Sequence, residues 1–301
     1  MVENWDSPFR EKCFPGTFVT YITVQPLRRL QICSIIMEVM GYIAALLIGV
    51  SLGLIGGGGS ILTVPVLVYL FSLNPILSTS YSLFVVGSTS LVGAINNYLK
   101  GFVRIKTALL FGLSSITTVY LTRKFLIPLI PENIGNIDGF QITAEIVTMV
   151  LFAILMMIAS ISMIKERKQK SISDTENRKV NMPKLLMYGV VIGIATGLLG
   201  AGGGFLLIPT LVLLVKLPMK DAVGTSLLII ALNSLIGFTG DIGHFTMNWI
   251  FLIKITFISI VGIFLGGLIG KKISGDKLKK AFGWFVLAMG VYILTKEIFF
   301  S

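Results

Sequence analysis

Apolar stretches of about 20 residues recur along the whole chain, and they restrict its fold more than any other feature. An α-helix rises about 1.5 Å per residue, so about 20 apolar residues cross the hydrocarbon core of a bilayer. Only 13% of the residues are charged, against about 25% in soluble domains. The apolar runs are continuous, whereas the strands of a transmembrane barrel alternate. The sequence therefore predicts an all-α polytopic membrane protein.

We expect ten helical segments, five on each side of a basic stretch at residues 165–183. Residues 1–34 mix prolines with basic residues and predict a poorly ordered N-terminal extension. The first transmembrane repeat is expected at 35–164, the linker at 165–183 and the second repeat at 184–301. The ten segments lie near 35–54, 60–73, 78–99, 105–127, 142–164, 184–201, 204–216, 222–240, 248–270 and 281–299.

One glycine-rich motif occurs twice. GLIGGGGSILTVP runs from Gly53 to Pro65, and GLLGAGGGFLLIP runs from Gly197 to Pro209, with a constant offset of 144 residues. Similarity between apolar helices would match leucines, but not glycines, a proline and serines together. The two halves are therefore a duplicated unit. The same offset also relates Ser226, Leu227, Ser234, Leu235 and Gly237 to Ser82, Leu83, Ser90, Leu91 and Gly93.

The distribution of charge predicts the orientation. Lys and Arg are enriched in cytoplasmic loops, so we place linker 165–183 and the loop containing Lys100 and Arg104 in the cytoplasm. Asp241, His244 and both termini are then external. Because each unit has an odd number of segments, the two units point in opposite directions across the membrane, as in many secondary transporters.

The glycine tracts predict two broken helices. Segments 60–73 and 204–216 are too short to span a bilayer, and each carries a proline suited to a first helical turn, Pro65 or Pro209. A helix start presents free N–H groups and a partial positive charge, and glycine leaves that backbone accessible. We therefore expect an anion site at the midplane, where two half-helices begin. Its backbone would come from Gly56, Gly57, Gly58, Gly59, Gly200, Ala201, Gly202, Gly203 and Gly204.

Polar side chains in the following spans are expected to complete this site. Ser82, Thr225, Ser226 and Asn233 could donate to an oxyanion, although hydroxyl groups can also bond to their own helix. Among the glycines, the spacing of Gly262, Gly266 and Gly270 favours helix packing instead.

The sequence also suggests roles for charged and capping residues. Arg123 and Lys124 are expected either to concentrate anions at an entrance or to anchor the chain at the interface. We interpret Asn74, Ser78 and Asp221 as residues that cap the starts of their helices. No metal motif or cofactor motif is visible, and the net charge of +11 is explained by the basic loops without a nucleic-acid partner.

At GLIGGGGSILTVPVL, GLLGAGGGFLLIPTL and the serine-bearing spans after them, the chain resembles the TauE/SafE family of sulfite-exporter-like permeases. The resemblance covers residues from about 35 to 300. It implies transport of sulfite, sulfonates or related anions across the bacterial inner membrane, mostly outwards.

The predicted function is therefore a secondary transporter of small sulfur-containing anions with alternating access, and not an enzyme. The expected partners are the anion and the lipid bilayer, and a homodimer remains open. One alternative is an anion channel of the same architecture. Another is an intramembrane serine hydrolase that uses Ser226 and His244.

Overall fold

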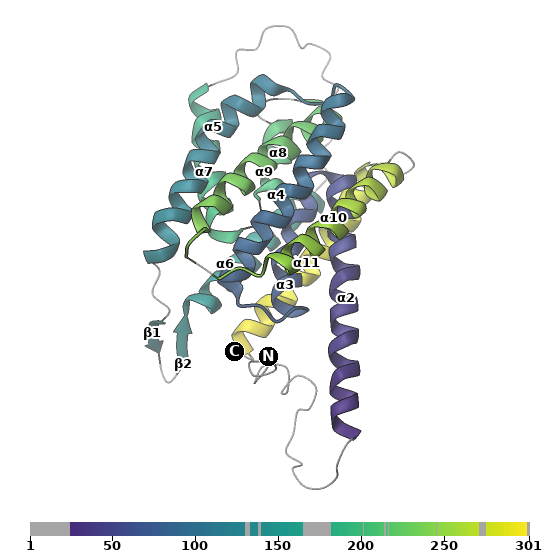
Figure 1. Ribbon diagram of the computed structural model, residues 1–301. Helices are drawn as coiled ribbons and strands as arrows, with labels where there is room; N and C mark the ends of the chain where they lie inside the picture. The colour runs from purple at the N-terminus through teal and green to yellow at the C-terminus, as the bar shows by residue number, and fades with distance from the viewer. Residues whose placement is uncertain are drawn as a thin grey trace.

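The computed structural model is a bundle of helices (Figure 1) and confirms the all-α membrane class. It describes residues 25–129, 133–137, 140–164, 182–200, 202–213, 215, 217–244, 246–270 and 275–299. Residues 1–24 and 165–181, where the extension and the linker are expected, lie outside the described residues. The described α-helices are α2 (Gln25–Ile55), α3 (Thr63–Tyr69), α4 (Pro75–Leu99), α5 (Ile105–Leu121), α6 (Ala144–Ile164), α7 (Met182–Leu199), α8 (Gly204–Leu213), α9 (Met219–Asp241), α10 (Trp249–Ile269) and α11 (Gly275–Phe299).

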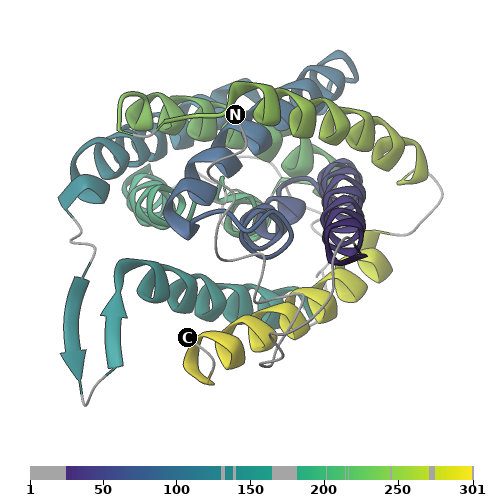
Figure 2. The same ribbon diagram turned by 60° about the horizontal axis from the view of Figure 1, so that its bottom comes forward.

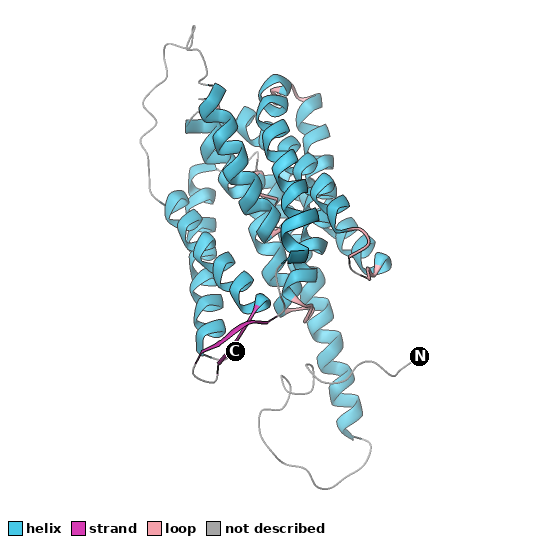
Figure 3. Cartoon of the chain, turned by 90° about the vertical axis from the view of Figure 1, so that its left-hand side faces the viewer, coloured by secondary structure: helices cyan, strands magenta, loops and turns pink. Residues whose placement is uncertain are grey.

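Three local features differ from the expectation. Helix α2 begins ten residues before the expected boundary, and Pro26 is its second residue, a position that tolerates proline because no amide partner is needed there. Helix α5 continues into a π-helical turn, η2 (Thr122–Leu126), and a short 3-10 turn, η3 (Ile127–Leu129). The loop between η3 and α6 contains an antiparallel hairpin of β1 (Asn133–Ile137) and β2 (Phe140–Thr143), drawn in magenta in Figure 3.

Six helices in the described part of the chain are long and apolar enough to cross a membrane. Large apolar side chains such as Leu113, Ile253 and Phe257 are more than half exposed on the outside of the bundle. Such positions suit contact with lipid, which offers no hydrogen bonds. The six spans are Glu38–Ile55, Pro75–Leu99, Ile105–Leu126, Ala144–Ile161, Met219–Asp241 and Trp249–Ile269.

Helices α4 and α9, which are equivalent in the two halves, pack against each other in opposite directions. A Cβ added at Gly93 would lie 3.2 Å from Leu227 Cδ1, and one added at Gly237 would lie 3.5 Å from Leu83 Cδ1. Residue numbers therefore rise along α4 as they fall along α9. Helix α2 lies along α10, and its equivalent α7 lies along α5. This is the arrangement that an inverted duplication would give, and the orientation of each complete repeat in the membrane stays a prediction.

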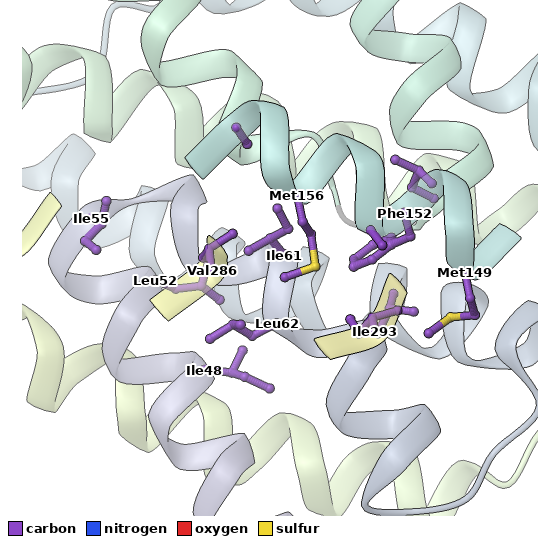
Figure 4. Packing of buried hydrophobic residues seen from close by; sticks show 14 of the residues in the cluster. Ile48, Leu52, Ile55, Ile61, Leu62, Met149, Phe152, Met156, Val286 and Ile293 are labelled. Carbon is purple, nitrogen blue, oxygen red and sulfur yellow. The ribbon is translucent and has the colours of Figure 1, made fainter. Parts of the chain in front are cut away.

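Clusters of buried apolar residues hold the helices together. One cluster joins α2, α3, α6 and α11 (Figure 4), and it includes Ile61 and Val64 beside the first glycine tract. A second joins α4, α5, α7 and α9 around Leu207 and Leu211 of α8. Figure 2 shows α6 and α11 side by side along one edge of the bundle. Helix α3 thus packs in the first cluster and α8 mainly in the second, although Leu206 of α8 packs against both.

Candidate functional site

The first glycine tract interrupts a helix at one residue. Helix α2 ends at Ile55, and Gly56 has φ +73°, a left-handed conformation that glycine adopts without steric cost. The chain then forms a 3-10 helix, η1 (Gly57–Leu62), which leads directly into α3. The predicted break is present, but the unwinding is confined to Gly56 because the next glycines form a tighter helix.

The second tract is unwound over a longer stretch. Helix α7 ends at Leu199, and Gly200, Gly202 and Gly203 all have φ between +66° and +68° before α8 begins at Gly204. The ten residues of α8 span about 15 Å, half the hydrocarbon core. Ala201 lies outside the described residues.

The expected place of proline in a first helical turn is found at Pro65 and is wrong for Pro209. Pro65 is the third residue of α3 and follows η1 without a break, and Pro209 is the sixth residue of α8. The glycines can themselves form helix, so both half-helices begin upstream of their prolines. The helix starts are consequently glycine backbone.

The starts of the two half-helices meet. Gly57 is the first residue of η1 and Gly204 is the first residue of α8. A Cβ added to either glycine would overlap the Cα atom of the other. The two helix starts therefore touch backbone to backbone, and no residue except glycine fits at this crossing.

Two buried serines of α9 lie beside the tracts, and two of α4 are buried without partners among the described residues. Ser226 Oγ would lie 3.4 Å from a Cβ added at Gly56, and it donates to the carbonyl of Val223 at 2.9 Å. Ser234 Oγ would lie 2.8 Å from a Cβ added at Gly202. The hydroxyl groups of Ser82, Ser90 and Ser234 are buried with no hydrogen-bond partner among the described residues. These hydroxyls can still bond to a ligand.

Two predicted site residues have structural partners instead. Thr225 Oγ1 accepts a hydrogen bond of 3.0 Å from the backbone N–H of Arg104. Asn233 Nδ2 donates to Ser115 Oγ at 2.7 Å, while its Oδ1 atom has no partner among the described residues. Both bonds join α9 to α5, so Thr225 contributes mainly to packing and Asn233 retains one polar atom for other contacts.

Two further hydroxyl residues adjoin the tracts and were not predicted. A Cβ added at Gly59 would overlap Ser51 Oγ, and one added at Gly203 would overlap Thr196 Oγ1. Each hydroxyl residue lies in the helix that precedes its tract, within two turns of the first glycine. A polar residue at this distance in an otherwise apolar helix is the signal that could have identified them.

The two charged residues expected at an entrance, Arg123 and Lys124, lie in different environments. Arg123 is 0% exposed, and its Nη1 atom donates to Asp241 Oδ2 at 3.0 Å and to Thr79 Oγ1 at 3.0 Å. Lys124 is exposed, and its ammonium group lies 3.3 Å from the hydroxyl of Tyr120. Only Lys124 can therefore attract an anion from solvent in this conformation. Successive side chains on a helical turn point in different directions, so the two neighbouring residues of η2 meet different environments.

Asp241 also differs from its expected place in an external loop. It is the last residue of α9 and its side chain is 1% exposed in the ion pair. Ser80 donates to the same carboxylate oxygen at 2.5 Å. The chain thus has a buried carboxylate that its position near the end of a span did not reveal.

The expected capping residues are confirmed at one position of three. Asn74 caps α4, since its side chain accepts from the N–H groups of Ile76 and Leu77. Ser78 lies inside α4. Asp221 lies in the first turn of α9, where it accepts a hydrogen bond of 2.7 Å from Arg104 Nε.

The residues of the hydrolase alternative do not meet. Ser226 lies near the start of α9, and His244 follows its end and is exposed. The fifteen residues of helix from Ser226 to Asp241 rise about 22 Å. A nucleophile and its base must be within hydrogen-bond reach, so these two side chains cannot act as such a pair in this structure.

Comparisons with known proteins give a family and several relatives. The family model described as "Sulfite exporter TauE/SafE" matches residues 41–293. A "Probable membrane transporter protein" of Xylella fastidiosa is 30% identical over 83% of this chain and 92% of its own length. The "Probable membrane transporter protein YunE" of Bacillus subtilis is 27% identical over 88% of this chain and 98% of its own length. No solved structure matches.

Proposed function

The chain belongs to the sulfite exporter TauE/SafE family of membrane transporters, and we propose that it carries small sulfur-containing anions, such as sulfite or organosulfonates, by alternating access. It is an integral membrane protein of the kind found in the bacterial inner membrane. The substrate class follows from the family description, and the chemistry of the glycine tracts supports an anion independently.

The contact between the starts of η1 and α8 is the observation that carries the proposal. Each helix start presents N–H groups without intrahelical partners and about half a positive charge. Gly57 and Gly204 carry no side chains of their own over this backbone, and the nearest side-chain atom at Gly204 is Ile230 Cδ1. Two such ends facing each other favour an anion without a lysine or arginine between them.

The division of the bundle supports alternating access. Helix α3 packs in one apolar cluster and α8 mainly in another, with Leu206 of α8 against both. The 3-10 helix η1, which leads into α3, touches α8 through the glycine contact. A glycine contact has no interlocking side chains, so one core can shift against the other at low steric cost. Movement of the half-helices relative to each other would open the site first to one side and then to the other.

Purified protein in liposomes tests this function. We expect sulfite, or a sulfonate such as sulfoacetate, to raise the thermal unfolding temperature, because a ligand that binds only the native state stabilises it. Sulfate, thiosulfate and chloride serve as comparisons. We also expect vesicles loaded with unlabelled substrate to accumulate labelled substrate by exchange.

Two results would speak against the proposal in different ways. Stabilisation by cations or neutral solutes alone would exclude an anion site. Rapid conductance without exchange would indicate the channel alternative.

A further inference from the structure

Arg123 is fully buried, yet one edge of its guanidinium group is without a partner. Nη1 makes the contacts with Asp241, Thr79 and Ser80. Nε and Nη2 have no hydrogen-bond partner in the described part of the chain. These two nitrogen atoms form the side-on edge of the planar group, which binds two oxygens of an oxyanion at once. Buried charged donors without partners are costly, so an oxyanion on this edge would be strongly favoured.

The guanidinium group lies beside the second glycine tract. Thr79 accepts a bond from Arg123, and a Cβ added at Gly200 would overlap the backbone of this same threonine. One residue before Arg123, Thr122 packs against Gly197 at the end of α7. A Cβ added at Gly240 would lie only 3.1 Å from Arg123 Cβ, so a glycine in α9 permits the close approach. Arg123 is therefore placed at the beginning of the unwound stretch.

The backbone at Arg123 is also unusual. It belongs to the π-helical turn η2, and such turns occur frequently at functional sites. The ion pair occurs in one half of the molecule only. With the offset of 144 residues, the position equivalent to Arg123 is Gly267 and the position equivalent to Asp241 is Asn97. An ion pair needed only to support the duplicated framework would have no reason to be confined to one half.

We propose that Arg123 binds the transported anion through its Nε and Nη2 atoms, and that Asp241 holds this side chain when no anion is bound. The inference rests on the proposed anion transport. Arg123 and Asp241 together are neutral, so an arriving anion introduces one unbalanced negative charge into a buried site. Protonation of Asp241 restores the balance, and the anion on the Nε and Nη2 edge then becomes the counter-charge of the guanidinium group.

The groups around Asp241 are consistent with this exchange. Among the described residues, Arg123 faces it from η2, Ser80 faces it from α4, and His244 follows it after α9. His244 is exposed and its backbone N–H donates to the backbone carbonyl of Asp241, so the end of α9 that carries the carboxylate lies next to solvent. Anion binding is therefore coupled to uptake of one proton from solvent by Asp241.

Three variants separate a binding role from a purely structural one. Arg123→Gln with Asp241→Asn keeps the site neutral and avoids an unpaired buried charge. We expect its affinity for methanesulfonate, measured by thermal stabilisation and by calorimetry, to fall at least about tenfold, since a charge-assisted bidentate contact is lost. Asp241→Asn alone leaves the cation without a competitor, so its affinity should equal or exceed that of the unmodified protein.

The dependence on pH gives a second readout. Methanesulfonate keeps its charge across the neutral range, so a change in its affinity reports on the protein. With the unmodified protein, affinity should fall as pH rises, because binding takes up a proton. With Asp241→Asn this dependence should disappear.

The matched control is Arg104→Gln with Asp221→Asn. This pair joins the starts of α5 and α9, whereas Arg123 and Asp241 join their ends. We expect its removal to change anion affinity by less than about twofold, since it lies at the opposite ends of the two helices and the Arg104 side chain is exposed.

Unchanged affinity in the Arg123→Gln, Asp241→Asn protein would overturn the proposal and leave a structural ion pair. If that protein does not fold, Arg123→Lys replaces it, because lysine keeps the charge and lacks the planar edge; unchanged affinity in this variant would have the same meaning. Failure of the unmodified protein to bind any anion would instead refute the proposed function itself.

Discussion

At the scale of single residues, the contact between Gly57 and Gly204 decides whether the two half-helices can meet. Most glycines in a membrane helix can be replaced where space allows, but here each glycine occupies the space that the other's Cβ would need. The requirement arises from two backbones that cross, and it is independent of helix propensity.

Replacing Gly57 with alanine should therefore abolish transport, or reduce it at least about tenfold, by forcing the two helix starts apart. Flux into liposomes, corrected for the amount of folded protein, measures the effect. Gly112→Ala is the control, because a Cβ there would lie 3.6 Å from Ile116 Cδ1, an ordinary contact. Normal flux in the Gly57→Ala protein would show that the crossing is not required.

At the scale of elements, glycine has a second use in the contact between α2 and α10. Gly262 and Gly266 lie against the backbone of α2 at Leu46 and Val50. The predicted packing role of these glycines is confirmed. Small residues allow such close approach because lipid supplies no hydrophobic force between helices and van der Waals contact must hold them.

Adjacent glycines in α10 allow a paired test of this packing. Gly266→Ala would overlap the carbonyl of Val50, whereas a Cβ at Gly267 meets nothing within 4 Å. We expect Gly266→Ala to destabilise the protein by about 1–3 kcal/mol. Gly267→Ala should be neutral or stabilise it by up to about 1 kcal/mol, since alanine is the better helix former. Thermal unfolding in detergent distinguishes them, and equal unfolding temperatures would contradict the close packing of α2 and α10.

At the scale of the whole molecule, two ion pairs join α5 and α9 at both ends. Arg104 and Asp221 lie at the starts of the two helices, and Arg123 and Asp241 lie at their ends. Helices α5 and α9 therefore run in the same direction, as the positive charges of the loops predict. The hairpin and the C-terminal end of α11 lie at the same end of the bundle (Figure 1).

This arrangement makes the orientation in the membrane testable. We expect a cysteine at Asn136, in β1, to react with an impermeant maleimide added to intact cells, and a cysteine at Lys100 to react only after permeabilisation. Both substitutions are made in a protein in which Cys13 and Cys33 are replaced by serine. The opposite pattern would invert the predicted topology.

Much of the architecture could be predicted because the bilayer restricts what each segment can be. A stretch of apolar residues must be helical to satisfy its backbone in lipid, so the ten helices follow from composition and length. The offset of 144 residues revealed the duplication, and the tracts from Gly56 and Gly200 marked the breaks. These features are local in sequence and need no knowledge of which helices are neighbours.

The partners of buried polar groups were decided only by the tertiary structure. Arg123 and Asp241 each resemble a residue at the membrane surface when their own spans are read alone, and they become a buried ion pair only when η2 meets the end of α9. Thr225 is engaged because Arg104 happens to lie against it. The amino-acid sequence by itself determined the helices, their repeat and their breaks. Packing decided which charges and hydroxyl groups are paired, because burial and hydrogen bonding depend on neighbours that are distant along the chain.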